Sequence, residues 1–240
     1  SDCNAACPGC ARTLNSDILE VTSFSFTDLQ RLLPNEKYIK GKDIKLCGVL
    51  GDPMIHPEVL QITEYLLRNG AKVTISTNVG VATEQTWEEL GKLSGQYKDF
   101  LVLMACIDGH KETNHIYRVN TKWNIIERNL NAFARHHYKR KDTLNKWVYI
   151  VFDHNEHEIE AAKAHAKELN FQFFTRTGMR NSMHQWVAEL GKKNNKTKKV
   201  ITTTGNKEQK RKDEVYKLAE KVAKNEIDES ILQTISCKFI

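Results

Sequence analysis

Three cysteines near the start of the sequence have the spacing of a metal centre. Cys3, Cys7 and Cys10 lie within eight residues of one another. Thiols this close converge on one metal, and a 240-residue chain with a core of its own does not depend on disulfides. An iron–sulfur cubane takes four thiolates, so three leave one iron open to a substrate. The alternative is a zinc site completed by a distant Cys or His, although no second Cys/His pair in the sequence has zinc-like spacing.

A second set of candidates follows the apolar runs of the sequence, where strands would end. Ligands bind at the carboxyl ends of parallel strands, in open sheets and in barrels alike. We therefore expect this set to border a binding site. Its members are Gly51, Asp52, Pro53, Ser76, Asn78, Cys106, Asp108, Arg118 and Asn155.

The two aspartates of this set have a local interpretation as well as a functional one. Asp52 is suited to receive a cationic group, because a cation held near a metal cluster needs a fixed acceptor. Asp52 also precedes Pro53, as a turn residue does. Asp108 precedes Gly109, a pair that is equally typical of a tight turn and of a site. Both interpretations stay open for each aspartate.

The other polar candidates also have alternatives. Asn78 ends a predicted strand and could reach a ligand, but an asparagine just ahead of Gly80 also forms turns. Arg118 could neutralise a ligand carboxylate, whereas a lone arginine is more often a solvated surface residue. Asn155 stands three residues before Glu158, which predicts mainly a helix N-cap with its reciprocal carboxylate.

The elements that would position these residues alternate between strand and helix. Apolar runs predict strands at 44–49, 72–77, 100–107, 146–152 and 171–174. Helical patterns lie near 26–33, 58–69, 84–93 and 123–136 and after Asn155. Pro57 and Gly70 bound the second of these helices, as a helix-starting proline and a C-terminal glycine do. Apolar strands separated by single helices predict an α/β fold with a parallel sheet, either doubly wound or a barrel.

Composition and charge exclude a disordered chain and a membrane-spanning one. Hydrophobic residues make up 40% of the sequence, and no apolar run approaches the roughly 20 residues of a spanning helix. The net charge of +6 arises in residues 192–212, which hold nine Lys or Arg and one Glu. This segment favours a linker or surface insertion over capture of nucleic acid or an acidic peptide. The scattered cysteines indicate a reducing, cytoplasmic setting.

The cysteine loop and four later segments resemble the motifs of a known family. CNAACPGCAR resembles the CxxxCxxC signature of radical S-adenosylmethionine (radical SAM) enzymes. GVLGDPMIHPE resembles the GGEP-type motif of that family, ISTNVG its TNG strand end, ACIDG its SIDG, and VFDHNEHEIEAAK its fifth strand and helix. Five matches in the right order are far more specific than any one of the last four. Gly9 replaces a residue that is usually aromatic, and Cys106 replaces the serine of SIDG.

This resemblance implies a partial (β/α)6 barrel of the TIM-like type, whose first strand would precede Ser1. It implies that Cys3, Cys7 and Cys10 hold a 4Fe-4S cluster and that S-adenosylmethionine (SAM) chelates the fourth iron. An electron from an external flavodoxin- or ferredoxin-like reductant would then cleave SAM reductively. The products would be methionine and a 5'-deoxyadenosyl radical that abstracts hydrogen from a substrate.

The resemblance also assigns the second set of candidates to SAM. Gly51, Asp52 and Pro53 match the motif whose backbone and carboxylate receive the SAM amino group. Cys106 occupies the place of a serine that contacts the SAM carboxylate, which Arg118 would neutralise. The remaining candidates for SAM contacts are Ser76, Asn78, Asp108 and Asn155, the last near the adenine or ribose.

The sequence divides into three predicted parts. Residues 1–190 form the core, 191–214 a basic linker or insertion, and 215–240 a helix followed by SILQTISCKFI. This ending resembles the entrance to a SPASM or twitch extension, in which Cys237 would be the first ligand of an auxiliary cluster. The alternative for Cys237 is a buried or free thiol. A SPASM-like ending implies a peptide or protein substrate. The alternative function is a degenerate metal-binding barrel that holds nucleic acid through its basic segment.

Overall fold

A computed structural model describes residues 2–14, 23–47 and 51–176 of the chain. The chain divides into two compact units, Ser1–Gln185 and Trp186–Ile240, and all described residues belong to the first. The predicted linker at 191–214, the predicted extension at 215–240 and Cys237 lie outside the described residues. In the described part, no helix is long and apolar enough to cross a membrane.

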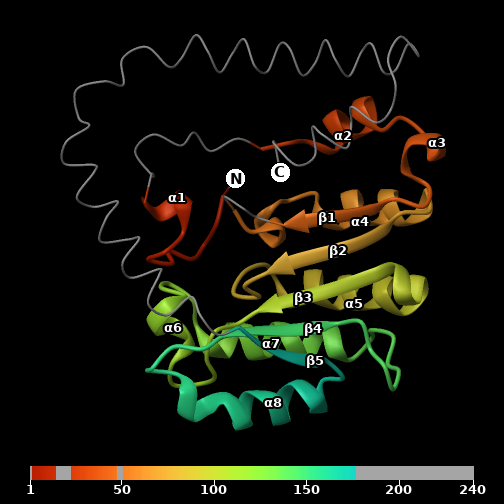
Figure 1. Ribbon diagram of the computed structural model, residues 1–240. Coiled ribbons are helices and arrows are strands. Elements are labelled where there is room, and N and C mark those ends of the chain that lie inside the picture. The colour runs from red at the N-terminus through yellow and green to blue at the C-terminus, as the bar shows by residue number, and fades with distance from the viewer. Residues whose placement is uncertain (1, 15–22, 48–50, 177–240) are drawn as a thin grey trace, which may run out of the picture. The chain divides into compact units, whose positions relative to one another are not determined.

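Five parallel strands form one sheet, in the order in which they follow along the chain (Figure 1). They are β1 (Asp43–Cys47), β2 (Lys72–Thr77), β3 (Leu101–Cys106), β4 (Lys146–Ile150) and β5 (Gln172–Arg176). All five predicted strands are confirmed, with small differences at their ends. The predicted α/β class and parallel pairing are confirmed as well, because each connection between strands contains a helix. The described strands form a sheet without closure, and the partial barrel stays a prediction.

The long helices lie where the sequence predicts them. They are α2 (Phe26–Leu32), α4 (Val59–Arg68), α5 (Glu84–Tyr97), α7 (Trp123–Ala134) and α8 (Ile159–Glu168). Helix α5 runs about one turn beyond the predicted end at residue 93. The short helices of the described part are α1 (Ala11–Leu14), α3 (Glu36–Ile39), α6 (Asn114–Tyr117), η1 (Pro53–Ile55), η2 (Lys98–Phe100) and η3 (Glu156–Glu158).

The four helices that connect the strands cover one face of the sheet, and α4, α5 and α7 lie behind the strands in Figure 1. Alternate strand residues point into this layer and are almost completely shielded from water: Val73, Ile75, Leu103, Ala105, Trp147 and Tyr149. The helices contribute Leu66, Trp87, Leu130, Phe133 and Ala166 to the same core. Full burial of each large apolar side chain contributes about 1.5–3 kcal/mol, so this layer fixes the sheet and the loops at its edge.

A glycine ends α4, as the sequence predicts. Gly70 has a φ of +81°, a left-handed conformation that costs glycine nothing. Its N–H donates to Leu67 O at 3.0 Å, and the next N–H, from Ala71, donates to Leu66 O at 3.0 Å. These bonds satisfy carbonyls at the helix end and turn the chain directly into β2.

Asn155 occupies the predicted N-cap position, at the start of η3, but the predicted reciprocal capping with Glu158 does not form. Asn155 makes no side-chain capping bond, and the carboxylate of Glu158 bonds to a distant loop. A capping box forms instead at the start of α2, between Ser25 and Asp28. The pattern misleads here because buried backbone groups far away in the sequence compete for the same polar side chains.

Candidate active site

Two asparagines hold the cysteine loop against the chain that follows β2. Asn78 Nδ2 donates to Asn4 Oδ1 at 2.9 Å, and Asn4 Nδ2 donates to Gly80 O at 3.1 Å. A Cβ on Gly80 would lie 2.8 Å from Asn78 Oδ1 and 3.0 Å from Asn4 Nδ2, so a side chain at this position would displace these two amides. On the other side of the loop, Ala6 N donates to Val119 O at 3.0 Å. The loop therefore joins segments that follow two different strands.

The thiols of the loop meet polar side chains from these segments. Asn78 Nδ2 lies 3.7 Å from Cys3 Sγ, and Arg118 Nη1 lies 3.9 Å from Cys7 Sγ. Cys7 is buried, while Cys3 and Cys10 are half-buried. Burial raises the pKa of both Cys3 and Cys7, so without a metal these groups are thiols at neutral pH. Metal binding at this loop would release protons.

The three sulfur atoms of the loop are not arranged as the ligands of one zinc ion. Within the described residues, the sulfur atoms of Cys3, Cys7 and Cys10 do not all lie within 4.8 Å of one another. Tetrahedral zinc holds thiolates at about 2.3 Å, which places them about 3.8 Å apart. In a cubane each cysteine binds a different iron, so the thiolates stand farther apart. The loop without metal is therefore not a preformed zinc site, and the iron–sulfur cluster stays a prediction.

Asp52 is a buried acceptor for the end of β2. Its carboxylate accepts hydrogen bonds from Asn78 N at 2.7 Å and from Thr77 Oγ1 at 2.8 and 3.0 Å. It also accepts from Met54 N at 3.0 Å, and its own N–H donates to Asp2 O at 2.7 Å. Burial raises the pKa of Asp52 although these donors favour its ionised form. The local interpretation of Asp52 as a turn residue is thus confirmed, and its carboxylate also ties β2 to the start of the chain.

Asp108 and Arg118 form an ion pair beside the cysteine loop. Arg118 Nε donates to Asp108 Oδ2 at 2.7 Å, and 18% of the arginine side chain and 0% of the aspartate side chain are exposed. The other oxygen of Asp108 accepts from Ile150 N at 2.7 Å. Burial acts to lower the pKa of Arg118, but Asp108 and the nearby thiols of Cys7 and Cys106 raise it overall. The interpretation of Arg118 as a solvated surface residue is wrong.

Asn155 is completely buried at the end of β4 and holds Asp108 in place. Its Nδ2 donates to Asp108 O at 2.8 Å and to Ile150 O at 2.9 Å, and its Oδ1 accepts from Phe152 N at 2.7 Å. The side chain therefore connects the ends of β3 and β4. A role near the adenine or ribose of SAM stays a prediction.

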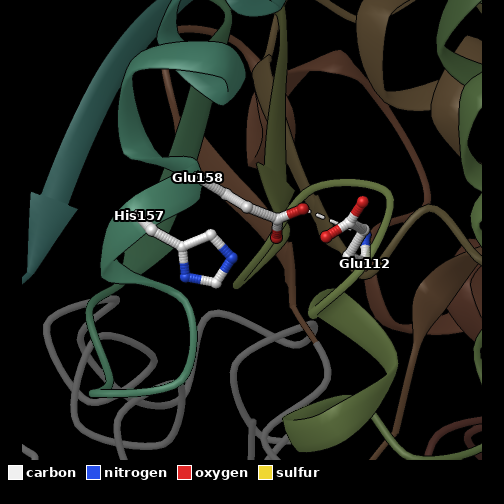
Figure 2. Close-up of side chains that lie close together, drawn as sticks. All are labelled: Glu112, His157 and Glu158. Atoms are coloured by element: carbon white, nitrogen blue, oxygen red, sulfur yellow. Dashed lines mark hydrogen bonds between the residues drawn. The ribbon is translucent and has the colours of Figure 1, made fainter.

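Glu158 anchors the loop that connects Asp108 to Arg118. Its carboxylate accepts from His110 N at 2.9 Å and Glu112 N at 3.0 Å, and also from the hydroxyl of Thr113. The ligand atoms of Glu112, His157 and Glu158 lie close enough together to share a metal ion (Figure 2). Among the described residues, this is the one cluster of at least three potential metal ligands. Because the Glu158 oxygens already serve the loop, this cluster is explained by its structural role.

Ser76 and Cys106 meet on the face of the sheet opposite the described helices α4, α5, α7 and α8. Their Oγ and Sγ atoms are 3.4 Å apart, and both residues are half-buried. Burial raises the pKa of Cys106. Gly51 and Pro53 flank Asp52 and are half-buried at the same edge of the sheet. The candidates thus gather in three groups, around Cys3, around Cys7 and around Cys106, and the charge of Arg118 acts on the last two.

Sequence reasoning missed two asparagines of this region. Asn4 lies between the cysteines, and its place inside the motif was the available signal. Asn114 is buried and accepts from Asp108 N at 3.0 Å through its Oδ1. A Cβ on Gly109 would lie 2.3 Å from Asn114 N, so the chain needs glycine directly after Asp108. No local pattern marks Asn114, because its partner becomes its neighbour only in the folded chain.

No protein-family model and no curated protein sequence matches this chain. Solved structures of Streptococcus suis SuiB have a similar fold. SuiB bound to S-adenosylmethionine matches with a TM-score of 0.55 and 13% identity, over 81% of this chain and 43% of that chain. SuiB bound to the precursor peptide SuiA matches with a TM-score of 0.57 and 12% identity, over 81% of this chain and 45% of that chain. The chain spans less than half the length of SuiB and shares its fold with that part.

Proposed function

We propose that this chain is the core of a radical SAM enzyme that acts on a peptide or protein. The observation that carries the proposal is the convergence of the three-cysteine loop on Asn78 and Arg118 at one edge of a parallel sheet. Structures of similar fold, those of SuiB, hold SAM and a precursor peptide, which supports both parts of the proposal. Ligands of such sheets bind at this edge.

Cys3, Cys7 and Cys10 are the residues that would hold the 4Fe-4S cluster. The cluster would pass an electron from an external flavodoxin- or ferredoxin-like reductant to SAM, whose cleavage gives methionine and a 5'-deoxyadenosyl radical. Asn78 and Arg118 place N–H donors at 3.7 Å from Cys3 Sγ and 3.9 Å from Cys7 Sγ. Hydrogen bonds to cluster sulfurs raise the reduction potential, so these two side chains would ease reduction of the cluster.

Arg118 would orient the carboxylate of SAM. Its Nε donates to Asp108 and its Nη1 lies beside Cys7, which leaves Nη2 for an incoming carboxylate. Asp108 holds the guanidinium in one orientation, and Asn155 holds the backbone of Asp108. The arginine is thereby set before SAM arrives, which lowers the entropy lost on binding.

The segment 51–53 would receive the amino group of SAM. Met54, Thr77 and Asn78 already donate to the carboxylate of Asp52. Four lone-pair sites on a carboxylate leave little capacity beyond these donors. We therefore assign Asp52 to fixing the backbone of this segment and to supplying a negative charge near the ammonium group.

The test is anaerobic reconstitution of the full chain with iron and sulfide. We expect about four irons per three-cysteine loop, an EPR signal that changes when SAM is added, and release of 5'-deoxyadenosine under a strong reductant. A chain with Cys3, Cys7 and Cys10 all changed to Ala should lose the iron and the SAM cleavage. Cys47→Ala is the matched control, because Cys47 is a half-buried cysteine outside the loop, and it should retain both. Stoichiometric zinc without SAM cleavage would refute the proposal.

A further inference from the structure

The face of the sheet opposite the described helices α4, α5, α7 and α8, here called the open face, can be identified residue by residue. Ser76 and Cys106 contact one another on it from neighbouring strands. The residues beside them, Ile75, Thr77 and Ala105, are buried on the helix side. Because side chains alternate along a strand and paired residues of parallel strands share a face, the register then assigns every other strand residue to a face.

Four cationic side chains belong to the open face. Lys72 lies four residues before Ser76 on β2, and Lys45 pairs with Thr74 of that strand. Lys146 pairs with Met104, which lies two residues before Cys106 on β3. Arg176 pairs with Ile150, which lies four residues after Lys146 on β4. These four residues are named the cationic row: Lys45, Lys72, Lys146 and Arg176.

The cationic row carries unbalanced charge. In the described part of the chain none of the four side chains forms an ion pair. Lys72 and Lys146 are half-buried, and Lys146 Nζ lies over the ring of Phe174 at 5.4 Å from its centroid. Asp43 is the one carboxylate that the described strands place on the same face. Two lysines on the helices, Lys92 and Lys163, pair with Glu89 and Glu160.

The geometry points to an acidic peptide segment as the ligand of the open face. This inference rests on the proposed function, because such a segment would be the substrate that lies across the sheet below the SAM site. Unpaired cations gathered on one surface attract an anionic partner and select against a cationic one. The same argument disfavours the chain's own residues 192–212, whose nine Lys or Arg have the wrong sign.

The spacing of the cationic row fits an extended peptide. Strands are about 4.8 Å apart and residues rise about 3.3 Å along them, which places Lys146 about 14–16 Å from each of Lys45, Lys72 and Arg176. An extended chain covers that distance in four to five residues. The inferred ligand therefore carries carboxylates at intervals of about four residues.

The experiment measures binding of a fluorescein-labelled peptide to the full chain by fluorescence anisotropy. The probe has about 12 residues, with a glutamate at every fourth position among serine and glycine, and its control replaces each glutamate by glutamine. We expect the glutamate peptide to bind and its affinity to fall as salt is raised from about 50 to 300 mM. We expect Lys72→Gln combined with Lys146→Gln to weaken binding about tenfold. Lys45→Gln combined with Arg176→Gln, both at exposed residues, should do the same.

Two pairs of control substitutions distinguish the cations of the open face from cations elsewhere in the chain. Lys92→Gln with Lys163→Gln removes charge from two helices and should leave the affinity unchanged. Lys198→Gln with Lys199→Gln removes charge from 192–212, and it should also have little effect. Equal binding of the glutamine peptide, or a loss confined to the change at residues 198 and 199, would overturn the inference. An affinity that neither open-face pair alters would overturn it as well.

The outcome is independent of the test of the proposed function, because anisotropy needs neither a cluster nor SAM. Binding to the open face without SAM cleavage would leave an acidic-peptide site on a protein that is not a radical SAM enzyme. SAM cleavage without this binding would keep the enzyme and reject the acidic substrate. Circular dichroism of each variant reports whether the fold is retained.

Discussion

The change Asp52→Ala should lower the free energy of unfolding by about 2–4 kcal/mol at neutral pH. The carboxylate accepts from the buried N–H groups of Asn78 and Met54 and from the hydroxyl of Thr77. A buried donor left without an acceptor costs about 1–3 kcal/mol, and two backbone N–H groups cannot turn to other acceptors. Loss of the buried charge offsets part of this cost, because burial raises the pKa of Asp52 and so penalises its ionised form.

Urea unfolding followed by tryptophan fluorescence measures this effect, since Trp87 and Trp147 are completely buried and report the core. Asp43→Ala is the matched control, because Asp43 is exposed at the start of β1 and should change stability by less than about 0.5 kcal/mol. Asp52→Asn keeps one acceptor oxygen, so its free energy of unfolding should lie between those of Asp52→Ala and Asp43→Ala. Equal stability of the Asp52→Ala and Asp43→Ala chains would refute the reasoning.

The pH dependence gives a second check on Asp52. Its pKa in the folded chain is raised above the ordinary value of 3.8 by burial. The difference in unfolding free energy between the unchanged chain and Asp52→Asn is therefore largest below pH 3.8. It declines as the pH rises through the raised pKa of Asp52 in the folded chain. An increase in this difference with rising pH would show that the hydrogen bonds outweigh burial.

Three further predictions concern the loops around the candidate site. Arg118→Gln should lower the free energy of unfolding in urea by about 3 kcal/mol, because it leaves Asp108 buried without a counter-charge. Adding Asp108→Asn should restore part of this loss. Arg135→Gln, which breaks a surface ion pair, should lower the free energy of unfolding by less than about 1 kcal/mol. Gly109→Ala should destabilise the chain more than Gly41→Ala. A Cβ on Gly109 would lie 2.3 Å from Asn114 N, whereas at Gly41 no atom lies within 4 Å and only the φ of +74° strains an alanine. His110 Nε2 and His165 Nδ1 lie 3.2 Å apart, and burial lowers the pKa of both rings. The free energy of unfolding should therefore fall as the pH drops below the ordinary histidine pKa of 6.5. If His165→Gln unfolds with the same pH profile as the unchanged chain, that explanation is wrong.

The order of strands and helices could be predicted because each buried parallel strand is an apolar run of its own. The run at 72–77 is observed as β2 without change, and Gly70 ends α4 as expected. These features depend on residues close together in the sequence, such as a helix and the glycine that follows it. The cysteine loop could be found for the same reason, because its three thiols lie within a few residues.

The roles of the polar residues could not be predicted in this way. Asn155 and Glu158 have the spacing of a helix cap, yet each bonds to backbone groups more than 40 residues away. Arg118 has no charged neighbour in the sequence that marks it as buried, and its partners Asp108 and Cys7 meet it only after the strands pair. A side chain bonds to whichever unsatisfied group the fold brings closest, and sequence spacing does not contain that distance.

The sequence by itself therefore determined the α/β class, the succession of strands and helices along the chain and the position of the three thiols, since local spacing and hydrophobic pattern decide these. Only the tertiary structure decided which polar groups surround the thiols and which face of the sheet carries Lys45, Lys72, Lys146 and Arg176. The physical reason is register. A shift of one residue in the pairing of a strand would send these side chains to the opposite face, and packing of the core against the helices excludes that shift.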